Sequence, residues 1–207
     1  MQFLIPVLVG LLALPAGVVA PVETAYAATP VAATSTTALV AAPLPAPKLT
    51  LAPVATSLTT KLTAYNAVPA QTDNNPYWTA SGAFSNPEVV AARSGDLASK
   101  LPYGTVIAIE RAGSDTPSCG YSKVESQIGY RVIADAMNPR ISDTVDVLLN
   151  QKNTVPYNGV EINPGRALGV CGQVTIRVVG KIDIKDIPAT QAQLANMVDQ
   201  STELAER

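Results

Sequence analysis

The sequence predicts a small all-β barrel that ends in a single helix. From about residue 58 onward, short runs of β-branched residues alternate with clusters of Gly, Pro, Asn and Asp. Six of these runs are long enough to form strands, at residues 61–67, 89–92, 105–110, 130–134, 144–149 and 174–184. Six short strands within about 125 residues are typical of a barrel rather than of an α/β sheet.

The C-terminal segment, residues 188–207, carries the one strong helical pattern. Its apolar residues recur on one face of a helix, namely at Leu194, Met197, Val198, Leu204 and Ala205. Asp186 precedes the segment and is expected to cap it. Such a face packs on the barrel in the simpler interpretation, and it binds a partner in the alternative one.

The composition excludes several classes of chemistry. The chain has 207 residues, of which 14% are charged, and none is His. This rules out Ser-His-Asp triads, Cys-His pairs and His-ligated zinc, so any acid–base catalysis must use Asp, Glu, Lys or Tyr. A net charge of −2 provides no general attraction for nucleic acid. No cofactor and no metal site is expected.

The first 27 residues form an apolar leader. Residues 1–22 carry no charged side chain, and Ala25 and Ala27 supply the small residues of a signal-peptidase site, with cleavage expected before Ala28. A retained membrane anchor is the alternative, although Pro6 and Pro15 disfavour a spanning helix. We therefore expect an exported, extracytoplasmic protein (periplasmic, wall-bound or secreted), either free or tethered to the membrane.

A linker is expected between the leader and the barrel. Of residues 28–60, 22 of 33 are Ala, Thr or Pro, and Lys48 is the only charged one. This composition is typical of an extended, disordered tether with partly polyproline-like conformation. The expected organisation is a leader at 1–27, a linker at 28–59, a barrel domain at 60–184 and the C-terminal helix at 185–207.

The chain has two cysteines, Cys119 and Cys171. In an exported protein an even pair indicates one disulfide, which here would close a loop of 52 residues. Two free thiols are the alternative, and without His the pair makes a poor metal site.

Two carboxylates lie at two consecutive expected strands, close to the loop that joins them. Asp135 ends one apolar run, and Asp146 lies eleven positions later between Val145 and Val147. A charge within an apolar strand needs a partner, a protonated state or a cavity. From the pattern alone the favoured interpretation is a strand with one face in solvent, on which Asp146 alternates with Val145 and Val147.

Four further segments accompany these carboxylates. Residues 79–82 read Thr-Ala-Ser-Gly, residues 89–92 Val-Val-Ala-Ala, residues 101–105 Leu-Pro-Tyr-Gly-Thr and residues 167–169 Ala-Leu-Gly. Together with the Asp pair, this combination resembles the three-aspartate (3D) domain, a double-psi β-barrel related to membrane-bound lytic transglycosylase A and rare lipoprotein A. The resemblance covers residues 60–184 and implies a six-stranded double-psi barrel. The chain differs from the family at Trp78, which stands where members carry Lys, and at residues 136–139, where they carry Gly-Gly.

The resemblance implies a function in the cell wall. Lytic transglycosylases cleave the MurNAc–GlcNAc bond of peptidoglycan with one carboxyl as acid and then base, and the family match assigns Asp146 to this role. Asp135 would raise its pKa or hold the sugar, and Thr79 and Asp96 would contribute to substrate binding. The partner is then a peptidoglycan strand. The alternative is a barrel that binds peptidoglycan without cleaving it, and a third possibility is a purely structural module.

Overall fold

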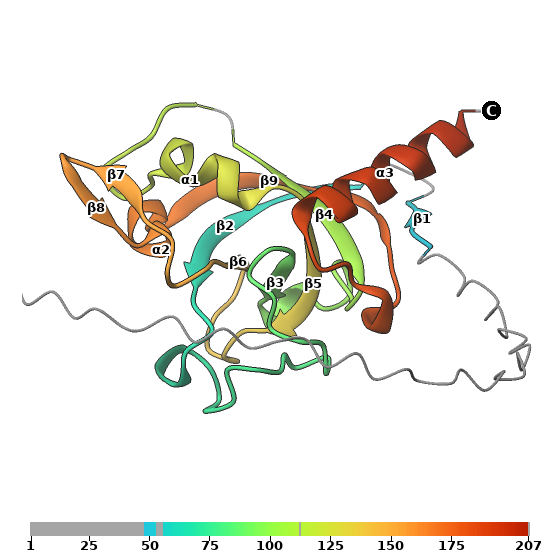
Figure 1. The fold of residues 1–207 in the computed structure, drawn as a ribbon, viewed down its shortest axis with the longest axis horizontal. Helices are drawn as coiled ribbons and strands as arrows, with labels where there is room; N and C mark the ends of the chain where they lie inside the picture. The colour runs from blue at the N-terminus through green and yellow to red at the C-terminus, as the bar shows by residue number, and fades with distance from the viewer. Residues whose placement is uncertain (1–47, 53–55, 112, 207) are drawn as a thin grey trace, which may run out of the picture. The chain divides into compact units, whose positions relative to one another are not determined.

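Six strands form a barrel in the part of the chain that the structure describes. The computed structural model describes residues 48–52, 56–111 and 113–206, and Figure 1 shows the arrangement. The barrel strands are β2 (Ser57–Tyr65), β3 (Val90–Arg93), β4 (Thr105–Glu110), β5 (Arg131–Ala136), β6 (Thr144–Leu148) and β9 (Cys171–Lys181). The six predicted strands are thus confirmed, with shifts of a few residues at their ends.

The strands close on one another in a mixed order. Neighbours in the sheet run β9-β2-β6-β3-β5-β4, and β4 pairs in turn with β9. The β2–β6 and β3–β5 pairs are parallel, whereas β3–β6, β4–β5, β2–β9 and β4–β9 are antiparallel. Closure leaves no free edge in the ring of six strands, which removes the usual site of edge-to-edge aggregation.

Both faces of strands β3 and β5 are covered. In β5, Ile133 belongs to one buried cluster, whereas its neighbours Val132 and Ala134 belong to a second. The same division separates Ala91 from Ala92 in β3. Strands buried on both faces read as continuous apolar runs, which explains why these segments show little polar alternation.

One side of the barrel carries two short helices and a hairpin. Helix α1 (Tyr121–Ile128) contacts α2 (Pro164–Leu168), and both contact the hairpin of β7 (Val155–Tyr157) and β8 (Val160–Ile162). A disulfide joins Cys119, just before α1, to Cys171, the first residue of β9. This bond confirms the predicted pairing.

The C-terminal helix α3 (Gln191–Ala205) begins later than the sequence suggested, and its cap is not Asp186. Thr190 is the N-cap, because its side chain accepts from the backbone N of Gln193 while the Gln193 side chain accepts from the backbone N of Thr190. Asp186 instead ends the short 3-10 helix η3 (Ile184–Asp186), so the capping prediction was wrong.

The apolar face of α3 is only partly buried. Leu194 and Val198 are buried in the second cluster, whereas Leu204 is 72% exposed. The helix contacts β1 (Thr50–Leu51), which adds to β9, and the Ser201 hydroxyl donates to the carbonyl of Leu49. The interpretation that the helix packs on the barrel holds for its first half.

Ordered structure begins before residue 60. Strand β1 and the first residues of β2 lie within the segment expected to be linker, and Leu49 is buried. Pairing with β9 explains this, because a polar Thr-rich segment can satisfy its backbone in a sheet even where its composition is typical of a tether. The leader expected over residues 1–27 and most of the linker lie outside the described residues.

The buried guanidinium of Arg131 links several segments around β5 by hydrogen bonds. Arg131 is fully buried, and its guanidinium donates to the backbone carbonyls of Pro87, Val90, Gln127, Ile128 and Leu148. Burial lowers the pKa of this group to about 10. These carbonyls come from four different segments, so the side chain fixes their relative positions.

The described residues also bear on the cellular compartment. The disulfide is typical of a protein that folds in an oxidising, extracytoplasmic environment. Among the helices in the described ranges, none combines the length and the hydrophobicity needed to cross a bilayer.

Candidate functional site

The two predicted carboxylates line one cavity. It has a volume of about 650 Å³ and is bordered by strands β2, β3, β5 and β6 and by the loops that follow β2 and β5. The residues that form its chemical centre are Tyr65, Trp78, Ala80, Ala92, Asp135 and Asp146. The carboxylates therefore share a cleft, and the interpretation of Asp146 as one side of a simple solvent-facing strand does not describe its surroundings.

A β-bulge brings Asp135 to this cavity. Strand β3 pairs Ala91 with Ile133 but Ala92 with Asp135, so Ala134 is an extra residue in β5. Strict alternation would place Asp135 on the same face as Ile133, and the bulge shifts it to the other face. On the opposite edge of β3, Ala92 pairs with Asp146. The small side chain of Ala92 thus separates the two acids.

Asp146 is half-buried and is held by one hydroxyl. The Oγ1 of Thr63 donates to its Oδ1 over 2.7 Å, between residues that are register partners in the parallel β2–β6 pair. Burial, together with the nearby charge of Asp135, raises the pKa of Asp146 to about 6, although the hydrogen bond from Thr63 acts in the opposite direction. A carboxyl with this pKa exchanges its proton near neutral pH.

Asp135 is fixed more tightly. Its Oδ2 accepts from the hydroxyl of Tyr65 over 2.8 Å, and its Oδ1 accepts from the backbone N of Ala80 and of Ala136, each over 2.9 Å. Burial first, and then the charge of Asp135, raises the pKa of Tyr65 above its ordinary value, so this phenol remains a donor. Asp135 therefore has a fixed orientation beside Asp146.

Thr79 and Asp96 are not among the residues that line this cavity. Thr79 is buried, and its hydroxyl accepts from the backbone N of Ala83, which fixes the turn that presents the N–H of Ala80 to Asp135. Asp96 is exposed and accepts from the backbone N of Asp143. Hydrogen bonds, that from the Ser94 side chain first, lower the pKa of Asp96. The predicted substrate contacts thus stay predictions, with Thr79 one residue removed from the site.

Sequence reasoning missed Thr63 and Tyr65. Both lie on β2 two residues apart, so they share a face, and this alternation was the available signal. Their partners on β5 and β6 follow only from the register of the closed barrel. Gln71 and Asp73, from the loop after β2, also line the cavity and were not predicted.

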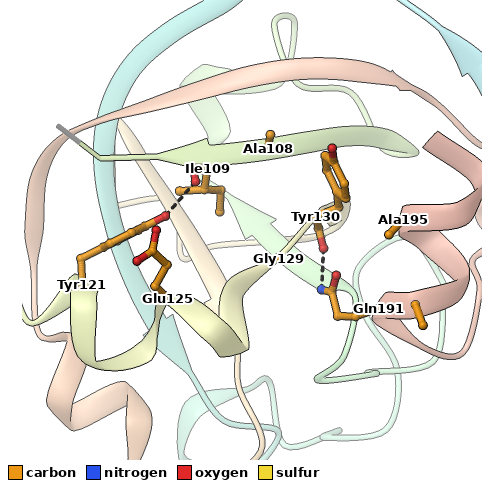
Figure 2. A pocket seen from close by; sticks show the side chains of 9 residues that line it. Ala108, Ile109, Tyr121, Glu125, Gly129, Tyr130, Gln191 and Ala195 are labelled. Carbon is orange, nitrogen blue, oxygen red and sulfur yellow. Dashed lines mark hydrogen bonds between the residues drawn. The ribbon is translucent and has the colours of Figure 1, made fainter. Parts of the chain in front are cut away.

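A second cavity, of about 520 Å³, lies between β4, α1 and the start of α3 (Figure 2). Two of its polar side chains form structural hydrogen bonds: the Tyr121 hydroxyl donates to the carbonyl of Ile109 over 2.8 Å, and the Gln191 amide donates to the carbonyl of Tyr130. Burial, followed by the charge of Glu125, raises the pKa of Tyr121 to about 12. With one carboxyl and no predicted site residue, this cavity is the weaker candidate.

In the described ranges, no three His, Cys, Asp or Glu residues are grouped so that they could hold a metal ion. Comparisons with family models, with curated proteins and with solved structures found no match for this chain.

Proposed function

We propose that this chain is an exported cell-wall protein whose barrel is a peptidoglycan lytic transglycosylase, with Asp146 as the acid and base. The observation that carries the proposal is that Asp146 lies half-buried in a cavity next to a second, firmly held carboxylate, with its pKa raised to about 6. A carboxyl of this kind is protonated in an appreciable fraction of molecules near neutral pH, as a general acid must be.

The fold is consistent with the proposal. Two parallel strand pairs within a closed six-stranded mixed barrel are the arrangement expected of the double-psi barrel of 3D-domain proteins. The spacing of Asp135 and Asp146, at the end of one strand and within the next, matches the pattern of that family.

The proposed reaction needs one carboxyl and no water. Asp146 donates its proton to the glycosidic oxygen, and the bond between that oxygen and C1 of MurNAc breaks. The 6-hydroxyl of the same MurNAc then attacks C1, and its proton passes to the carboxylate of Asp146. A 1,6-anhydro ring forms, the GlcNAc end leaves with a free hydroxyl, and Asp146 regains the protonated state.

The surrounding residues have supporting roles in this proposal. Thr63 bonds to Oδ1 of Asp146, so we assign the transferred proton to Oδ2. The charge of Asp135 favours the protonated acid in the resting enzyme and, during the reaction, stabilises the positive charge that develops at C1. Tyr65 and the N–H of Ala80 hold Asp135 in place for this task.

A second candidate function is binding of peptidoglycan without cleavage. The observation in its favour is that Asp135 accepts three hydrogen bonds from the protein itself, as a residue retained for structure would. In this case Asp146 serves as a hydrogen-bonding group for the sugar.

The test is incubation of the purified full-length protein with peptidoglycan sacculi, followed by mass spectrometry for 1,6-anhydro muropeptides. We expect product from the wild type and from Asp199→Asn, an exposed control on α3, but none from Asp146→Asn. Undiminished product from Asp146→Asn contradicts the assigned acid. Sedimentation with sacculi but no product from the wild type supports the binding function instead.

Export has a separate test. We expect the protein to be recovered outside the cytoplasm of the expressing cell, and N-terminal sequencing to begin at Ala28. An N-terminus at Met1 in a membrane fraction indicates the retained anchor, and recovery only in the cytoplasm contradicts export.

A further inference from the structure

An aromatic pair stands exposed on the turn between β2 and β3. Trp78 is 56% and Phe84 58% exposed, and their rings meet edge to face with centroids 6.3 Å apart. The two residues form an isolated bridge between the two arms of the turn. Large aromatic side chains are usually buried, so an exposed pair in a fixed geometry indicates a binding surface.

Backbone hydrogen bonds fix the position of this pair. The N–H of Thr79 donates to the carbonyl of Ala83, and that of Ser85 donates to the carbonyl of Tyr77, each over 2.9 Å. Gly82 has a φ of +83°, the left-handed conformation that lets the chain reverse here. The rings are thus presented by an ordered turn.

The same turn is joined to the candidate site. Trp78 lines the cavity of Asp146, and two residues later the N–H of Ala80 donates to Asp135 over 2.9 Å. A ligand that covers the indole of Trp78 therefore occupies the same cavity as the two carboxylates.

The other residues around the cavity indicate the chemistry of that ligand. Apolar side chains (Met137, Pro139 and Ile141) are mixed with hydrogen-bonding ones (Gln71, Thr72 and Asn138). Three carboxylates, including Asp73, line the cavity, whereas no Lys or Arg of the described residues does. A pyranose ring fits this combination, since it has an apolar C–H face and a rim of hydroxyl groups. A ring that bears its own carboxylate would be repelled.

We propose that Trp78, supported by Phe84, is the platform on which an uncharged N-acetylglucosamine ring of the glycan stacks, next to the MurNAc ring whose glycosidic oxygen Asp146 protonates. This inference rests on the proposed function and adds to it the sugar that this subsite selects. GlcNAc lacks the lactyl ether and the attached peptide that MurNAc carries at O3, so its ring leaves a clear face for the indole and brings no charged group to the acidic lining.

The first experiment uses the single tryptophan of the chain as a probe. Oligomers of N-acetylglucosamine are titrated into full-length Asp146→Asn, which excludes turnover, and the tryptophan emission is recorded. We expect a saturable blue shift, because stacking removes water from the indole. Hyaluronan oligomers of equal length, in which every second ring carries a carboxylate, should bind about tenfold more weakly. Unchanged emission with saturating N-acetylglucosamine oligomer, or equal affinity for both oligomers, overturns the proposal.

The second experiment assigns the effect to Trp78 by calorimetry. In the Asp146→Asn background, Trp78→Ala should weaken binding of the N-acetylglucosamine oligomer about tenfold, and Trp78→Phe should restore part of it. Tyr77→Ala is the matched control: it is 66% exposed on the same turn but does not line the cavity, so we expect unchanged affinity. Equal losses for Tyr77→Ala and Trp78→Ala contradict the assignment, as does full affinity in Trp78→Ala.

These outcomes separate the platform from the proposed reaction. Anhydro product formed by Trp78→Ala with unchanged KM overturns the platform and leaves the transglycosylase proposal intact. Binding that depends on Trp78, without product from the wild type, overturns the transglycosylase and leaves the platform as part of a binding protein.

Discussion

The Oγ1 of Thr63 donates to Oδ1 of Asp146 over 2.7 Å, and the two residues are register partners in the parallel β2–β6 pair. The bond crosses between segments 83 positions apart in the chain. This hydrogen bond lowers the pKa of Asp146, whereas burial and the charge of Asp135 raise that pKa. One hydroxyl on a neighbouring strand therefore tunes the candidate acid.

Removal of this hydroxyl should raise the pKa of Asp146 further. We expect Thr63→Val to shift it upward by about one pH unit, because a hydrogen bond to the charged form is lost while the side-chain shape is kept. Carbon-detected NMR titration of the Asp146 carboxyl measures this without reference to activity. Under the proposed function, the alkaline limb of the pH–rate profile should move by the same amount.

Thr60→Val is the matched control for this experiment. Thr60 lies on the same strand and is buried, and its Oγ1 is the one buried side-chain polar atom without a hydrogen-bond partner among the described residues. Its replacement should leave the Asp146 titration unchanged. Equal shifts in both variants would attribute the effect to the strand rather than to the bond.

The raised pKa of Asp146 also makes a prediction about stability. A carboxyl whose pKa is higher in the folded than in the unfolded chain binds more protons when folded, so stability falls as pH rises from about 4 to about 6. At about pH 7 the ionised Asp146 therefore destabilises the folded protein. The free energy of unfolding of Asp146→Asn should be about 2 kcal/mol larger than that of the wild type. At about pH 4 the gain should largely disappear.

Urea denaturation at the two pH values measures this difference. Asp199→Asn, on the exposed side of α3, should change stability at neither pH. A gain in Asp146→Asn that is equal at both pH values would contradict an origin in the titration of Asp146.

Two buried tyrosines allow a comparison of their hydroxyl groups. Tyr65 donates to the carboxylate of Asp135, whereas Tyr121 donates to the backbone carbonyl of Ile109, and both bonds are 2.8 Å long. We expect Tyr65→Phe to lower the free energy of unfolding by about 2 kcal/mol and Tyr121→Phe by about 1 kcal/mol, because bonds to charged acceptors are stronger. Chemical denaturation near neutral pH gives both values. A larger loss for Tyr121→Phe would show that the Asp135 bond contributes little.

The disulfide should contribute substantially to stability. It joins residues 52 positions apart, and the chain-entropy model assigns roughly 4 kcal/mol to a loop of this length. We expect Cys119→Ala/Cys171→Ala to lose about 2–4 kcal/mol in denaturation experiments, and wild-type protein unfolded under reducing conditions to lose a similar amount. If the double variant is as stable as the oxidised wild type, the bond does not restrain the unfolded chain.

The six barrel strands and the carboxylate pair were predictable from the sequence for a physical reason, whereas the short strands β1, β7 and β8 were not predicted. Runs such as residues 132–134 are apolar because the strand is buried on both faces, and the turn residues between runs mark the ends. Helix α1 was not predicted, because only Tyr121, Val124 and Ile128 of its eight residues are buried and polar side chains fill the rest. Three apolar positions in a short polar segment give too weak a helical period.

The geometry of the site depended on features that a linear pattern does not contain. The bulge at Ala134 decides which face of the sheet Asp135 occupies, and the residue types around Ala134 do not indicate a bulge. The bonds of Thr63 to Asp146 and of Tyr65 to Asp135 require the parallel register of β2 with β6 and the closure of the ring. The Asp186 cap failed because the chain forms a separate 3-10 turn first, and Thr190 then offers both halves of a capping box with Gln193.

Strand β9 pairs with β1, β2 and β4 and is the last strand of the chain. Biosynthesis proceeds from the N-terminus, so a growing polypeptide holds β2 and β4 with unpaired edges until residues 171–181 have been made. The disulfide cannot form before the same segment is made, because Cys171 is the first residue of β9. Polypeptides terminated upstream of residue 171 thus lack both the covalent link and the closing strand, and their open edges make them candidates for aggregation and proteolysis.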